Sequence, residues 1–131
     1  KLNQVLRKPL KMKKAIKIDV ALQQVYEVEI QDGLQAIYDA IGNGCSLMER
    51  AGCIPNDNPN SLGDDLYVDE EGYIKGEDYI LGGFQLDLPN CSKEVLANNG
   101  LILGANLEGE SCNCEIDVEQ IRKNVKFFVK R

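Results

Sequence analysis

The sequence predicts an α+β fold, in which a mostly antiparallel sheet of short strands carries one or two helices packed on one face. Three patterns predict it. Residues 15–20 and 25–30 alternate apolar and polar side chains, as half-buried strands do. Residues 34–41 repeat apolar side chains at helical spacing. Residues 100–104 form a continuous apolar run, which is typical of a strand buried on both faces.

The first half of the chain predicts two paired strands, a helix and a third strand. The alternating segments are joined by a turn at about residues 21–24, and Val25 is expected to face solvent with the glutamates of its strand. Asp32 is expected to cap the helix, and Gly42 to end it. The helix stripe comprises Leu34, Ile37, Tyr38 and Ile41, and it is followed by an irregular strand at 46–54 and a loop at 55–63.

The second half predicts a hairpin, further strands and a last helix. Residues 66–76 place two short apolar runs around an acidic turn, in which Gly72 is expected to supply a positive φ. Asp117 and Gln120 have the spacing of a capping box that opens a helix. The remaining elements are expected as strands at 79–88, 100–104, 112–116 and 125–129 and as helical turns at 92–99 and 118–123.

Charge is unevenly distributed along the chain. Residues 1–18 hold seven basic side chains and no acid, whereas residues 19–131 hold eight basic side chains and all 21 acids, a net charge of −13. We expect a basic leader at 1–12 and a single α+β domain at 13–131. The acidic body argues against a nucleic-acid groove, so nucleic acid is not expected as a partner.

The compartment expected from the sequence is the cytoplasm. No apolar run approaches the roughly 20 residues that span a bilayer, so no membrane partner is expected. No apolar segment follows the basic N-terminus as it does in a signal peptide. The natural start is expected at Met12 or upstream of Lys1. The five cysteines, an odd number, fit free thiols better than a disulfide framework.

Metal and cofactor chemistry finds little support in the residue types. Cys112 and Cys114 could place two thiols on one strand face, but no histidine is present to complete a zinc site. The lack of histidine also removes the commonest catalytic base and the Ser-His and Cys-His nucleophile pairs. We therefore expect no cofactor, no metal site and no catalytic residue.

Seven acids lie within fifteen residues near the expected hairpin. A hydrolase would need two or three of them to converge in a cleft. They are expected instead to form a solvated acidic face, with a partner-binding surface and a catalytic or metal site as the lesser alternatives. These acids are Asp64, Asp65, Asp69, Glu70, Glu71, Glu77 and Asp78.

Gly82, Gly83 and Phe84 are expected to hold a small anionic ligand. Backbone N–H groups without side chains suit a phosphate, and an aromatic face suits a base. Arg50 or Lys75 is expected to supply a cation nearby. A bulge or a bend in a strand is the alternative explanation of the glycine pair.

Four segments carry a family resemblance. They are Met12-Lys13-Lys14-Ala15-Ile16-Lys17-Ile18, the helix at 32–38, the segment 65–76, and the run 100–104 with the later Glu108-Gly109-Glu110. Together they resemble a family of small proteins of uncharacterised function encoded by phages, plasmids and conjugative elements. The resemblance covers residues 12–116, and the Asn- and Pro-rich insert at 55–60 departs from it. It carries over no catalytic residue.

The resemblance implies an accessory protein that binds a component of the host cell. The preferred expectation is a non-enzymatic anti-defence protein that sequesters a small nucleotide signal. The alternative is an acidic protein that blocks a host protein or mimics DNA, and an enzyme with clustered carboxylates is third. A homo-oligomer, most simply a dimer, is expected because a small domain of short strands has sheet edges to cover.

Overall fold

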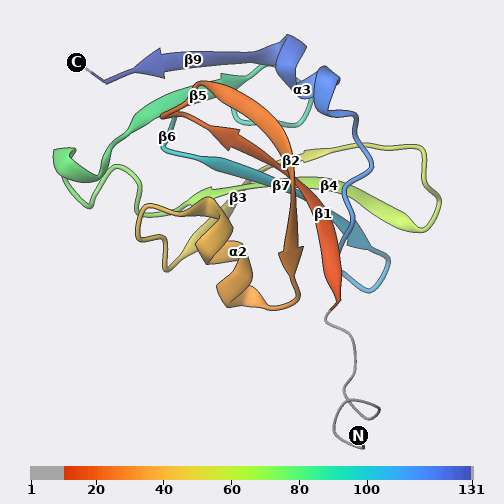
Figure 1. Ribbon diagram of the computed structural model, residues 1–131. Coiled ribbons are helices and arrows are strands. Elements are labelled where there is room, and N and C mark those ends of the chain that lie inside the picture. Colours follow the sequence, from red (N-terminus) through yellow and green to blue (C-terminus); the bar gives the residue numbers. More distant parts are fainter. Residues whose placement is uncertain (1–10, 131) are drawn as a thin grey trace, which may run out of the picture.

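Within the described residues, short antiparallel strands and two α-helices make up the fold (Figure 1). The computed structural model describes residues 11–130, so most of the expected leader at 1–12 lies outside the described residues. The elements, in chain order, are β1 (Met12–Asp19), β2 (Gln24–Gln31), α2 (Leu34–Ile41), β3 (Met48–Ile54), β4 (Ser61–Asp69), η1 (Glu77–Tyr79), β5 (Gly82–Leu86), β6 (Leu96–Ala97), β7 (Gly100–Asn106), β8 (Ser111–Cys112), α3 (Val118–Asn124) and β9 (Val125–Val129). The predicted α+β class is confirmed.

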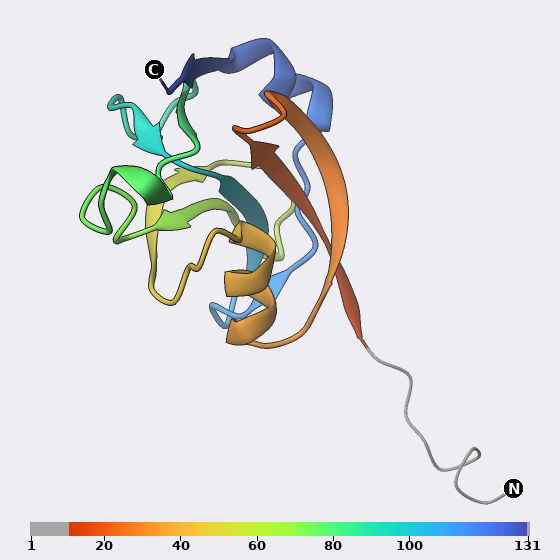
Figure 2. The same cartoon turned by 60° about the vertical axis from the view of Figure 1, so that its left-hand side comes forward.

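The strands form two sheets. The large sheet has the order β2-β1-β7-β4-β3, with β8 pairing to the end of β7. The small sheet has the order β6-β5-β9. Figures 1 and 2 show α2 on one side of the large sheet, and the small sheet with α3 on the other side. The two helices therefore lie on opposite sides of the large sheet, not on one face as expected.

Two hydrophobic cores explain this layering. The first lies between the two sheets and includes Phe84 and Ile102, with Ile121 of α3. The second lies between the large sheet and α2 and includes Leu101 and Leu103. β7 contributes to both cores, because successive side chains of a strand point to opposite faces. The predicted central strand, buried on both faces, is confirmed.

The first half of the chain follows the prediction closely. β1 and β2 pair over eight residues, and α2 ends at Gly42, which has φ 79°. Two details differ. Val25 is buried in the first core, because the start of β2 lies beside α3 and not in solvent. Gly33 occupies the cap position of α2 and makes no side-chain cap, whereas Asp32 forms an ion pair with Lys13 at 3.1 Å.

The expected hairpin at 66–76 is wrong. β4 pairs with β3 and β7, which flank it on both edges. The chain then enters a turn, in which Asp69 accepts a hydrogen bond from the Glu71 N–H at 2.9 Å. Ile74 is 78% exposed and belongs to no strand. Gly72 does not have a positive φ; it is required because a Cβ there would approach the Ala97 Cβ at 3.2 Å.

Two further elements differ from the prediction. Residues 92–99 form no helix; they contain β6, and Asn98 takes a φ of 67° before β7 begins. The strand expected at 112–116 is only β8, which ends at Cys112. The last helix and strand are confirmed as α3 and β9. Asp117 caps α3 by accepting from the Glu119 N–H at 3.0 Å.

Candidate ligand-binding face

The three residues of the expected ligand site do not share a face. β5 pairs with β9 regularly over five residues, so Gly82 and Gly83 form no bulge. Phe84 is fully buried in the core between the sheets. Its ring offers no face on which a base could stack, so this part of the expectation is corrected. The two glycines do line a hollow of about 160 Å³ on the small sheet.

The expected cations lie elsewhere and are already engaged. Arg50 lies on β3 and approaches Asp65 at 3.6 Å. The Lys75 Nζ lies 2.7 Å from an Asp69 carboxylate oxygen and 2.7 Å from the Gly44 carbonyl oxygen. The hydrogen bond with Asp69 raises the pKa of Lys75. Both side chains therefore hold parts of the fold together, and neither lines the hollow beside Gly82 and Gly83.

The seven acids do not form one solvated face. Asp64, Asp65 and Asp69 are buried. Asp64 and Asp65 are consecutive in β4 and therefore point to opposite faces of the sheet, which excludes a shared catalytic cleft. Only the four later acids lie at or near the surface: Glu70, Glu71, Glu77 and Asp78.

Three lysines converge on one hollow at the outer face of the small sheet. Lys93, Lys123 and Lys126 line a hollow of about 320 Å³, together with Gln85 and Asp87. We call it the lysine hollow. Lys93 makes a long, exposed ion pair of 3.8 Å with Asp87, whereas Lys123 and Lys126 make no ion pair with any residue from 11 to 130. Such an arrangement suits an anion with several oxygens.

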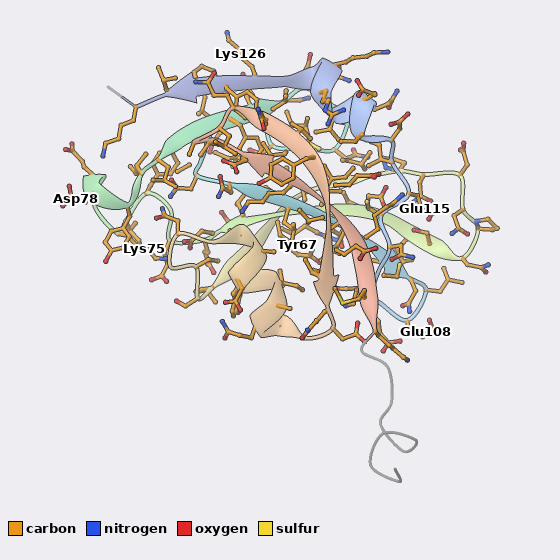
Figure 3. All side chains as sticks on the ribbon, in the orientation of Figure 1. Tyr67, Lys75, Asp78, Glu108, Glu115 and Lys126 are labelled. Atoms are coloured by element: carbon orange, nitrogen blue, oxygen red, sulfur yellow. The ribbon has the colours of Figure 1, made fainter. Side chains whose placement is uncertain are left out.

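Distant parts of the sequence position these lysines. β5 pairs with β9, so Gln85 lies opposite Lys126. The side-chain amide of Gln85 donates a hydrogen bond to the Lys93 carbonyl oxygen, and this bond fixes the backbone at Lys93. Lys123 comes from the last turn of α3, directly before β9. In Figure 3, Lys126 lies on β9 at the outer margin of the molecule and well apart from Lys75.

An aromatic ring lies next to the lysine hollow on the same face. Gly83 pairs with Phe128 and Gln85 with Lys126, so these pairs are two residues apart, about 7 Å along the strands. The Lys126 Nζ lies 5.3 Å from the centroid of the Phe128 ring. Phe128 is partly exposed and lines the smaller hollow with Gly83. We call this combined surface the outer face.

The sequence analysis missed Lys93, Lys123, Lys126 and Phe128. Each lysine alone is an ordinary surface residue, and only the β5–β9 pairing brings them together. One signal was present. Residues 118–130 hold four basic side chains and one acid, in a chain of net charge −6. Lys126 and Phe128 also alternate with core residues, which places them on the outward side of the predicted last strand.

Another hollow is a weaker candidate for an anion. It has a volume of about 860 Å³, lies beside the start of α2, and includes Lys13, Asp32 and Tyr67. Asp32 neutralises Lys13. Burial, followed by the nearby Asp65 carboxylate, raises the pKa of Tyr67 to about 12. Tyr67 is therefore a neutral hydrogen-bond donor to Asp65, at 3.2 Å, and not a proton-transfer group at neutral pH.

The cysteines do not form a metal site in the part of the chain that the structure describes. No group of three potential ligands from His, Cys, Asp and Glu was found between residues 11 and 130. Cys112 is partly exposed at the end of β8, whereas Cys114 is buried in the first core. Burial raises the pKa of Cys114 to about 11, which disfavours the thiolate that a metal would need.

Comparisons with known proteins leave the site to be judged on its geometry. No family model matches the chain, and neither a curated protein nor a solved structure matches it. The family resemblance therefore stays an expectation. Within residues 11–130, no helix is long and apolar enough to cross a membrane.

Proposed function

We propose that this protein is a non-enzymatic binding protein for a small phosphorylated ligand, a nucleotide, held on the outer face of the small sheet. The convergence of three lysines on one hollow is the observation that carries the proposal. Phosphate oxygens would contact Lys93, Lys123 and Lys126. The base would lie toward Phe128, because aromatic rings stack on every nucleobase.

The residue types on this face favour capture over turnover. The chain has no histidine, and the single acid of the lysine hollow, Asp87, is opposed by Lys93. A hydrolytic reaction needs a base that activates water, and a lysine cluster supplies charge stabilisation without one. We propose the cytoplasm of a host cell as the compartment and a phage or mobile element as the source, and the sequestering of a nucleotide signal as the role.

The first experiment identifies the ligand and separates capture from catalysis. The purified protein is incubated with nucleotide second messengers, separated from free ligand and heat-denatured, and the released material is analysed. Recovery of an intact nucleotide supports capture. A chemically altered nucleotide would mean an enzyme, and no bound nucleotide would overturn the proposal.

The second experiment locates the site. Lys123→Ala and Lys126→Ala should each weaken nucleotide binding about tenfold, because each removes a charged contact with phosphate. Lys14→Ala is the matched control, since Lys14 is an exposed lysine on β1 that does not line the lysine hollow. Equal affinity of all three variants would show that the site is elsewhere.

Gly83→Trp is not a clean test of this site. A Cβ at Gly83 would lie 2.9 Å from the Val95 Cγ1 and 3.0 Å from the Leu96 carbonyl oxygen. A larger side chain would therefore disturb the pairing of β5 with β6. Phe128→Ala is the better probe of stacking, because the ring is on the outer face of the sheet. Phe128→Ala should weaken the binding of a nucleotide more than it weakens the binding of inorganic phosphate.

A protein-blocking surface is the second candidate function. One exposed segment, residues 70–81, favours it. Tyr73 is 61% exposed and Ile74 is 78% exposed, and surface acids surround them. Exposed apolar side chains with a polar rim are typical of protein-binding surfaces. Two results together would support this candidate: the protein binds no nucleotide, and the Ile74→Asp variant no longer binds the host partner that the wild type binds.

A further inference from the structure

One edge of the small sheet is open along β9. β9 pairs with β5 over five consecutive residues, and no other strand within residues 11–130 pairs with it. On the open edge, alternate residues direct N–H and C=O groups away from the sheet. Figures 1 and 2 both show β9 at the outer margin of the molecule. A regular strand with an open edge is a template for another strand.

Two other sheet edges, β3 and the start of β2, are partly covered. On β3, the Cys53 N–H donates to the Asn90 carbonyl oxygen at 3.1 Å, and the Ala51 carbonyl oxygen accepts from the Ser92 N–H at 2.8 Å. On β2, the Arg122 side chain donates to the Val25 carbonyl oxygen at 2.9 Å. β9 has no comparable cover along its length among the described residues.

The two sides of β9 offer different chemistry. On the inner side, a hollow of about 360 Å³ is lined by Val25, Tyr26, Arg122, Val125 and Phe127. On the outer side, Lys126 is exposed. Lys130 directly follows β9 and lies four residues after Lys126, on the same side by strand alternation, where its Nζ also donates to the Glu77 carbonyl oxygen. A strand beside β9 would place alternate side chains in these two environments.

We propose that the open edge of β9 binds an extended acidic segment of a partner protein by strand addition. Main-chain hydrogen bonds to β9 give the segment its place, and alternate side chains give specificity. Apolar side chains enter the inner hollow against Phe127. Acidic side chains face Lys126 and Lys130, which select against basic segments.

A second copy of this chain is the poorer occupant. Two β9 strands placed edge to edge would bring Lys126, Lys130 and the basic end of α3 from both copies together. Like charges opposite one another destabilise a strand pair. This inference goes beyond the proposed nucleotide binding and does not rest on it. The two proposals share Lys126, but Lys93 lines only the lysine hollow and Phe127 lines only the inner hollow.

The test uses the full chain and three synthetic peptides of about six residues, the usual length of a strand. The first alternates Glu and Val, the second alternates Lys and Val, and the third is the Glu/Val peptide with an N-methyl group on every residue. Fluorescence anisotropy measures affinity, and amide hydrogen exchange locates binding. The Glu/Val peptide should bind about tenfold more tightly than the Lys/Val peptide and should protect the alternate amides of β9 that do not bond to β5.

The controls distinguish strand addition from other outcomes. N-methylation should abolish binding, because it blocks the main-chain hydrogen bonds while keeping the charge. The double variant Lys126→Glu, Lys130→Glu should reverse the preference between the peptides, whereas Lys14→Glu should not. Equal binding of the N-methylated peptide, or protection of another strand, would overturn the proposal. Protection of the open-edge amides of β9 without peptide, together with a dimer in sedimentation, would assign the edge to a second copy. Loss of nucleotide binding in Lys93→Ala with strand addition intact would separate the two proposals.

Discussion

The buried carboxylate of Asp64 should be one of the most important single side chains for stability. Asp64 is fully buried on β4 and accepts hydrogen bonds from two consecutive backbone groups, the Glu115 N–H at 3.1 Å and the Ile116 N–H at 2.8 Å. These bonds attach the segment that leads into α3 to the large sheet. In Asp64→Ala, both N–H groups would lose a charged acceptor.

The expected loss follows from these contacts. Each buried donor left without a partner costs about 1–3 kcal/mol. Removal of the carboxylate also relieves the cost of burying its charge, which offsets part of the loss. We therefore expect Asp64→Ala to lower the free energy of unfolding by about 3 kcal/mol, a large share of the roughly 5–15 kcal/mol of a typical domain.

Urea denaturation of the variant measures this loss. Asp57→Ala is the matched control, because Asp57 is an exposed aspartate in the neighbouring loop. Hydrogen exchange should show faster exchange of the amides of Glu115 and Ile116 in Asp64→Ala. A loss below about 1 kcal/mol, or a loss equal to that of Asp57→Ala, would refute the reasoning.

The pH dependence gives the same prediction a second readout. Burial raises the pKa of Asp64, outweighing the hydrogen bonds to Glu115 and Ile116 that lower it. The folded chain therefore takes up this proton at a higher pH than the unfolded chain does. The resulting stabilisation is present below the ordinary aspartate pKa and is lost as the pH rises through the raised pKa. The difference in unfolding free energy between wild type and Asp64→Asn should thus grow as the pH falls from neutrality to about 4.

Four further predictions concern the core, a tyrosine, the thiols and the assembly. Gly100→Ala should cost about 1–3 kcal/mol, because a Cβ there would lie 2.7 Å from the Phe84 Cζ; unchanged stability in urea would contradict this packing. In an absorbance titration one tyrosine should ionise near pH 12, and Tyr67→Phe should remove that step. Because the folded state favours the neutral phenol of Tyr67, the phenol contributes stability that is fully present below the ordinary tyrosine pKa and is lost as the pH rises to about 12. A thiol reagent should count five thiols in the denatured, non-reduced protein, with Cys114 reacting last in the native protein because burial raises its pKa to about 11; a count of three or fewer would indicate a disulfide. Light scattering at micromolar concentration should give a homo-oligomer that forms through a surface other than the β9 edge, and the mass of one chain would exclude it.

The elements predicted correctly are those that short stretches of sequence define by themselves. β7 was recognisable because residues 100–104 lack alternation, and a strand buried on both faces needs none. β1, β2 and α2 were recognisable from periodicity that a single face imposes. The hairpin prediction at 66–76 was wrong because its two apolar runs lie in different environments. Leu66 is in the core through pairing with residues far along the chain, whereas Ile74 is exposed.

The candidate site shows the same limit more sharply. Gly83 was found because a glycine pair is visible in any local pattern. Its aromatic and basic neighbours come from β9 and α3, some forty residues further on. No local pattern states that β5 pairs with β9, and without that pairing Phe84 is the nearest aromatic ring. The position that faces solvent at that point in the sheet belongs to Phe128 instead.

Net charge is a poor guide to a binding face for a related reason. The value of −13 for residues 19–131 describes an average, and in the sequence analysis it argued only against a nucleic-acid groove. Some of those acids are internal anchors: Asp64 holds the segment before α3, and Asp69 holds Lys75. Lys123 of α3 and Lys126 of β9 have no acidic partner among residues 11–130 and line the same hollow. Electrostatic recognition depends on the local field of a surface, and a basic face on an otherwise acidic protein directs an anionic partner to that face and away from the rest. Both proposals, a phosphorylated ligand at the lysine hollow and an acidic segment at the β9 edge, follow from this separation of charge.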